Sequence, residues 1–180
     1  MQVEFRKRAD GGSLAIVDRD DGVRLHLRSY DRTGEVPHDA VHLVGERCLG
    51  MRDGLWGSIA AGALFDSIEV VGGRQRHDRR RRSEEIRRRN AEQLRLAETV
   101  VGVLERCVDR DGTAVKKKLD EAWGITQTGP SPFSADDAGR AVEELRRLRE
   151  DWTSLAPGDP GPTFSWPAAT HRAGPVRRRP

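Results

Sequence analysis

A pair of histidines, His38 and His42, is the feature of this sequence whose residue types and spacing suggest chemistry. Pro37 suits the first position of a helix and Gly50 suits its left-handed exit, so the residues between them are predicted to be helical. Side chains four residues apart lie on the same face of a helix, one turn above the other. Two imidazoles in that arrangement can bind one divalent metal ion, so His38 and His42 are predicted metal ligands.

The third ligand is left open by the spacing. Glu46 continues the histidine row, but a rise of about 1.5 Å per residue places it roughly 12 Å along the axis from His38. An unbroken helix cannot easily bring these two side chains to the same ion, whereas His42 and Glu46 are close enough to share one. We predict that Glu46 is a third metal ligand or orients an imidazole. The alternative third ligands are Cys48, Glu69 and His77.

The string from His38 to His42 resembles the H-E-x-x-H helix of the zincin metalloproteases, with Asp39 in place of the glutamate. Gly45 also fits the extended zincin motif, in which Cys48 would stand at the position of a third histidine. The resemblance is limited to this helix. It implies zinc or another divalent transition metal as cofactor and metal-assisted hydrolysis as the reaction class. Asp39 is then the candidate catalytic residue, either as a general base or as a partner that holds one imidazole tautomer.

Composition limits the class of protein. The chain has 180 residues, of which 36% are hydrophobic and 34% charged, which fits one domain with solvated helix or tail. Two cysteines make no disulfide framework, and the N-terminus has no basic-then-apolar signal pattern. No apolar run approaches the roughly 20 residues of a membrane span. These features predict a cytoplasmic protein without membrane association.

Hydrophobic alternation predicts a small antiparallel sheet in the N-terminal region, 1–73. Apolar residues alternate with polar ones in Val3–Phe5 and Val23–Leu27, and the apolar run Leu14–Val17 between them is read as a further strand. A second, nearly all-apolar helix over 55–65 is expected to form an αα-hairpin with the histidine helix. A fourth strand is predicted at Ser67–Val71. The predicted fold class is therefore α+β.

Residues 74–156 are predicted to be helical. One long helix is expected from Ser83 to Val108, a shorter one is expected to be capped by Thr113, and another follows the capping-box pattern that begins at Ser134. The two long helices carry heptad-like apolar stripes, which could pair with each other or across a dimer. A homo-oligomer or a protein partner is therefore predicted. Residues 157–180 are rich in Pro and Gly and are predicted to be a disordered tail.

Two other functions are compatible with these patterns. The histidines could simply lie at the border of the apolar face of an amphipathic helix and have a structural role. The protein would then be a non-catalytic helical protein that dimerises or binds a partner. Alternatively, residues 74–95, with ten arginines against four acidic residues, could bind a phosphate backbone. No aromatic residues are interleaved with these arginines, and acidic neighbours can pair with them, so nucleic acid is not the partner we expect.

Overall fold

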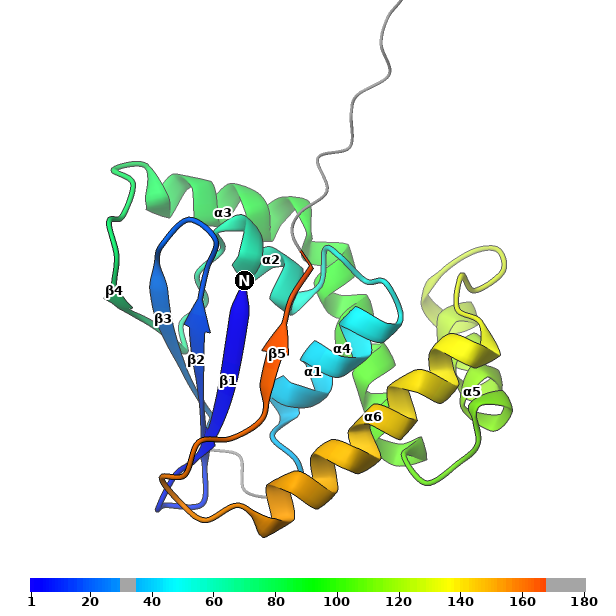
Figure 1. Ribbon diagram of the computed structural model, residues 1–180. Helices are drawn as coiled ribbons and strands as arrows, with labels where there is room; N and C mark the ends of the chain where they lie inside the picture. The colour runs from blue at the N-terminus through cyan, green and yellow to red at the C-terminus, as the bar shows by residue number, and fades with distance from the viewer. Residues whose placement is uncertain (30–34, 168–180) are drawn as a thin grey trace, which may run out of the picture.

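The structure is a computed structural model that describes residues 1–29 and 35–167. Within these residues, five antiparallel strands form one sheet in the order β4-β3-β2-β1-β5. The first four strands confirm the predicted small sheet near the N-terminus (Figure 1). The strands are β1 (Gln2–Lys7), β2 (Ser13–Asp18), β3 (Arg24–Ser29), β4 (Ile68–Gly72) and β5 (Thr163–Ser165).

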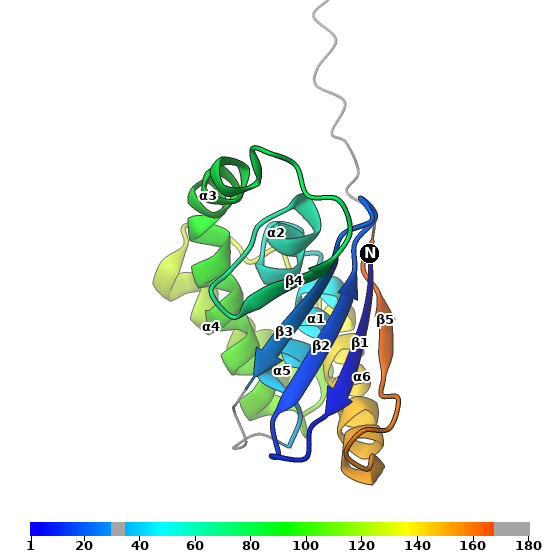
Figure 2. The same ribbon diagram turned by 90° about the vertical axis from the view of Figure 1, so that its left-hand side faces the viewer.

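One face of the sheet is apolar because successive side chains of a strand point to opposite faces. In β1, for example, Val3 and Phe5 are buried while Glu4 and Arg6 between them remain partly accessible. The helices all lie on the apolar side (Figure 2). Phe5 meets Trp56 of the second helix edge to face, with ring centroids 5.8 Å apart. The sheet and the helices therefore share one hydrophobic core.

Six helices accompany the sheet in the described residues, which confirms the α+β class. They are α1 (His38–Cys48), α2 (Leu55–Ala61), α3 (Arg79–Arg89), α4 (Ala91–Cys107), α5 (Gly112–Thr126) and α6 (Ala135–Ser154). The predicted capping box of α6 is present, because Ser134 and Asp137 satisfy each other's backbone amides. Thr113 is not the cap of α5. Asp111 caps that helix instead, accepting a hydrogen bond from the amide of Ala114.

The single long helix predicted from Ser83 to Val108 is wrong, since α3 and α4 are separate helices that meet at Asn90. The side-chain amide of Asn90 is buried and donates a hydrogen bond to the hydroxyl of Ser58, 3.0 Å away. This contact ties the junction to α2. An asparagine that binds another element in this way interrupts regular helix geometry. The apolar periodicity continues on both sides of Asn90, so the periodicity alone predicted one continuous helix.

The polypeptide near the C-terminus returns to the sheet. The expected tail from residue 157 therefore begins too early, because Thr163–Ser165 pair with β1 as strand β5. Phe164 and Trp166 are buried, and the amide of Trp166 donates to the carbonyl of Met1. The rest of the predicted tail, 168–180, lies outside the described residues. Among the described helices, none is long and apolar enough to cross a membrane.

Candidate metal centre

The close packing of α1 against α4 forms the site. Gly45 of α1 faces α4, and a Cβ atom at this position would lie 2.7 Å from Cδ1 of Leu104. The absence of a side chain therefore allows the two helices to approach closely. They run antiparallel, since His38 near the start of α1 meets Glu105 near the end of α4. His42, one turn further along α1, meets Glu98.

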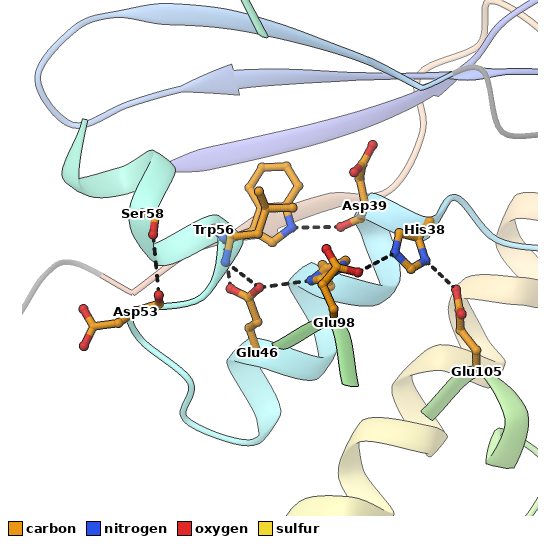
Figure 3. Close-up of polar contacts among 10 residues, drawn as sticks. His38, Asp39, Glu46, Asp53, Trp56, Ser58, Glu98 and Glu105 are labelled. Atoms are coloured by element: carbon orange, nitrogen blue, oxygen red, sulfur yellow. Dashed lines mark hydrogen bonds and ion pairs between the residues drawn. The ribbon is translucent and has the colours of Figure 1, made fainter. Parts of the chain in front are cut away.

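Both histidines direct Nε2 toward the same carboxylate oxygen. Oε2 of Glu98 lies 3.4 Å from Nε2 of His42 and 3.5 Å from Nε2 of His38. The two imidazole rings are edge to face, with centroids 4.8 Å apart. One potential ligand atom from each of His38, His42 and Glu98 lies within 4.8 Å of the others (Figure 3). Two predicted ligands therefore do converge, and the third group between them is Glu98.

The other ring nitrogen of each histidine also faces a carboxylate. Nδ1 of His42 is 3.2 Å from Oε1 of Glu46, and Nδ1 of His38 is 2.9 Å from Oε1 of Glu105. A carboxylate at Nδ1 favours the neutral tautomer that carries its proton there. Such a tautomer leaves the Nε2 lone pair available, and both Nε2 atoms lie beside Glu98. This is the arrangement by which carboxylates orient metal-binding histidines.

Glu46 connects the site to α2. Its carboxylate is buried and accepts hydrogen bonds from the amides of Leu55 and Trp56, at 2.7 and 3.0 Å. These are first-turn amides of α2, which have no partner inside the helix. Gly54 makes room for this contact, because a Cβ there would be 2.5 Å from Cδ of Glu46. Glu46 is thus placed to orient His42, which is one of the two roles predicted for it.

The contacts between His42 and its two carboxylate neighbours shift the pKa values of all three groups. Burial by itself would lower the pKa of His42, but contacts with Glu46 and Glu98 outweigh it and raise the pKa to about 9. The hydrogen bond with His42 lowers the pKa of Glu98 to about 2. Burial raises the pKa of Glu46, and the contact with His42 opposes that effect. Without a metal ion, a protonated His42 therefore faces an ionised Glu98 at neutral pH.

His38 is more accessible than His42, with 35% of its side chain exposed. Its hydrogen bond with Glu105 raises the pKa of His38, against the effects of burial and of the neighbouring His42. The site therefore combines a buried inner histidine with an outer histidine that solvent can reach.

Asp39, the candidate catalytic residue, is not brought to this cluster. Its carboxylate points away from Glu98 and His38 (Figure 3). Its backbone carbonyl accepts a hydrogen bond of 2.8 Å from the indole Nε1 of Trp56. The contribution of Asp39 that the structure displays is therefore a link between α1 and α2.

The alternative third ligands lie apart from the histidine pair. Cys48 donates a hydrogen bond from Sγ to Glu144, and burial with that carboxylate raises the pKa of the thiol to about 12. Glu69 is in β4, where its carboxylate is 3.5 Å from Arg28. His77 is exposed in the segment between β4 and α3. None of these side chains joins the His38–His42–Glu98 cluster in the described part of the chain.

Sequence reasoning missed Glu98 and Glu105. The signal that was present is their spacing, since residues seven apart on a helix share a face, which can lie against the histidine face of another helix. Many acidic residues of the chain have similar spacings. Only the packing of α4 on α1 singles out these two.

Protein-family models, curated proteins and solved structures were each compared with this chain, and none of the three comparisons gives a match.

Proposed function

We propose that this protein binds a divalent transition metal ion through Nε2 of His38, Nε2 of His42 and the carboxylate of Glu98. The observation that supports this function is the orientation of the two imidazoles. Each Nε2 lies beside the same oxygen of Glu98, while each Nδ1 faces a different carboxylate. A purely structural ion pair does not require both histidines to share one acceptor.

The separations of the candidate ligand atoms support a tetrahedral ion. A tetrahedral zinc ion with bonds of about 2.1 Å holds its ligand atoms about 3.4 Å apart. The two histidine-to-Glu98 separations are 3.4 and 3.5 Å. By contrast, these contacts are long for hydrogen bonds. These two separations thus fit an ion bound between each imidazole and Glu98, and all three candidate ligand atoms lie within 4.8 Å of one another.

The buried Nε2 of His42 gives a second argument. His42 is 1% exposed, and among the described residues its Nε2 has no hydrogen-bond partner in acceptable geometry. Leaving such an atom unsatisfied costs free energy. A metal ion would supply the missing interaction. Two imidazoles and a carboxylate form a donor set that suits zinc, so zinc is the ion we propose first.

The outer side of the centre is open to solvent, because the side chain of Glu98 is 64% exposed. Three protein ligands with a solvent-accessible fourth position are typical of catalytic rather than structural zinc sites. Zinc lowers the pKa of a bound water to about 7 and makes it nucleophilic. Metal-assisted hydrolysis is therefore the reaction class we propose.

Metal content tests the binding function. Protein purified without a metal-affinity tag is expected to retain or take up one zinc per chain, measured by elemental analysis and by calorimetric titration. Glu98→Gln should weaken zinc binding by tenfold or more, because a neutral amide replaces an anionic ligand. Glu92→Gln removes the same charge from another exposed position of α4 and should leave the affinity unchanged.

Cobalt substitution reports on geometry independently of affinity. A tetrahedral site with nitrogen and oxygen ligands gives strong visible absorption with Co²⁺, and this absorption should be lost in Glu98→Gln. If wild-type protein binds neither ion, or if both glutamate variants bind equally well, the histidines and carboxylates form only an ion-pair network between α1 and α4.

Hydrolysis is tested with the zinc-loaded protein and p-nitrophenyl acetate, a general ester probe. The expected result is turnover that disappears with a chelator and returns with zinc. The variant Asp39→Asn tests whether Asp39 is a general base or has a role away from the ion. If it is a general base, this variant keeps zinc but loses turnover. If its side chain acts away from the ion, as its orientation indicates, both should persist.

A further inference from the structure

A second cluster of functional side chains surrounds a small recess at another part of the molecule. The recess has a volume of about 40 Å³ and lies where the β2–β3 turn, the end of α2 and the start of α3 meet. The segment that leads from β4 into α3 passes over the same end of the sheet (Figure 2). Five arginines line the recess, namely Arg19, Arg74, Arg76, Arg79 and Arg82.

The positive charge of this arginine recess is poorly balanced. Asp21 is the one carboxylate among its described lining residues, and both of its oxygens already accept hydrogen bonds from Arg19. Arg76 pairs with Asp78, and Arg82 donates to the carbonyl of Ala61. Those two arginines therefore retain N–H donors for a ligand. The carboxylate of Asp78 is not part of the lining of the recess.

Two of the five guanidinium groups have no acidic partner. Within the residues that the structure describes, Arg74 and Arg79 make no side-chain ion pair or hydrogen bond. Like charges that converge in this way repel one another, and an anion between them would relieve that repulsion. Both side chains are exposed and thus reachable by a ligand from solvent.

The start of α3 adds to the positive potential. Arg79 is the first residue of this 11-residue helix, and its N-cap residue, Asp78, makes no side-chain capping bond. The amides of a first helical turn carry a partial positive charge and favour anions. The helix terminus and the five guanidinium groups therefore act in the same direction.

We propose that the arginine recess binds the phosphate group of a small phosphorylated compound. Arginine matches phosphate oxygens with paired N–H donors and remains charged at all relevant pH values. The small size of the recess suits a terminal phosphate better than the continuous backbone of a nucleic acid. The described lining also contains no aromatic ring on which a base would stack. This site is independent of the metal centre.

Calorimetric titration of the full chain with inorganic phosphate and with pyrophosphate tests the proposal. A chelator is present throughout, so that metal-bound phosphate does not contribute. Wild-type protein should bind at least one of the two probes at a single saturable site. The double variant Arg74→Gln/Arg79→Gln should bind at least tenfold more weakly, because two charged donors to the anion are lost.

The matched control is Arg80→Gln/Arg88→Gln, which removes two exposed arginines of α3 that do not line the recess. It loses the same net charge as the test variant. Its affinity for the probe should nevertheless stay within about twofold of wild type, because neither arginine lines the recess. Equal weakening in the two double variants, or no saturable binding by the wild type, would overturn the proposal. The proposal would also be overturned if the protein bound a DNA duplex more tightly than either phosphate probe and both double variants weakened DNA binding equally. That result would indicate a diffuse basic surface.

Discussion

His42 faces carboxylates at both ring nitrogens, Glu46 at Nδ1 and Glu98 at Nε2. In the absence of metal, a protonated imidazole is hydrogen-bonded to Glu46 and forms a longer ion pair, of 3.4 Å, with Glu98. If an ion binds as we propose, it would replace the proton on Nε2, while Nδ1 would keep its contact with Glu46. Binding of the proposed ion is therefore expected to release a proton.

The metal-free protein should lose stability as pH rises from 6.5 to 9. The pKa of His42 is raised from 6.5 to about 9 in the folded state. The stabilisation is therefore complete below pH 6.5 and disappears as pH passes through about 9. The expected loss in the free energy of unfolding is on the order of 1–3 kcal/mol, measured by urea unfolding with a chelator present.

Glu98→Gln provides the comparison for this prediction, since it removes one of the two carboxylates that hold the proton on His42. Its stability should fall less over the same pH range. In acid the sign is reversed, because the pKa of Glu98 is lowered from 4.5 to about 2 and its stabilisation is lost as pH falls through that interval. Identical pH profiles for wild type and variant would contradict the assignment.

At the scale of elements, Glu46 couples α1 to the start of α2. Its carboxylate contacts His42 on one side and the amides of Leu55 and Trp56 on the other. The α1–α2 connection can thus affect the orientation of a candidate ligand. Gly54 is the position at which this coupling can be tested with little change in chemistry.

Gly54→Ala should destabilise the protein by about 2–3 kcal/mol, because the new methyl group would overlap the buried carboxylate of Glu46. It should also weaken zinc binding about tenfold by displacing the group that orients His42. Chemical unfolding and zinc titration measure the two effects.

Gly124→Ala is the matched control, since nothing lies within 4 Å of a Cβ built at this position of α5. This change should be neutral or stabilise the helix by up to about 1 kcal/mol. If Gly54→Ala behaves like the control, the carboxylate of Glu46 is not confined as the structure indicates.

At the scale of the whole molecule, the sheet is completed by a strand from near the other end of the sequence. β5 pairs with β1, and Phe164 packs edge to face on Phe5 with ring centroids 6.0 Å apart. Arg47 of α1 also lies over the ring of Phe164. This single side chain therefore joins the sheet to the helical layer.

Phe164→Ala should lower the free energy of unfolding by about 3 kcal/mol, as expected when a buried aromatic ring is removed. Thr163→Ala alters the neighbouring exposed residue of the same strand and should change stability by less than about 0.5 kcal/mol. Thermal and urea unfolding would compare the two. Equal, small effects would mean that β5 contributes little to the fold.

The packing of the whole molecule also bears on the predicted homo-oligomer. The apolar stripes of α4 and α6, from which an oligomer or protein partner was predicted, are buried within the chain itself. Val101 and Leu104, for example, face α1 at Gly45. Oligomerisation therefore stays a prediction, and the stripes no longer provide an argument for it.

The sequence by itself determined the features that depend on near neighbours. Short apolar or alternating segments indicated the first four strands. Pro37 and Gly50 bounded the histidine helix, and Ser134 marked the start of α6. These features depend on backbone geometry and on contacts within a few residues, which a linear pattern records directly. The same reasoning placed His38 and His42 on one face of one helix.

Only the tertiary structure decided which groups surround those histidines. Glu105 is 67 positions from His38 in the sequence, and it reaches that ring because Gly45 allows α4 to pack closely on α1. The break at Asn90 and the strand at Phe164 likewise depend on partners far along the chain. Local periodicity specifies which face of an element is apolar. Many pairings of such faces bury similar areas, however, and the choice among them depends on the packing of the entire core.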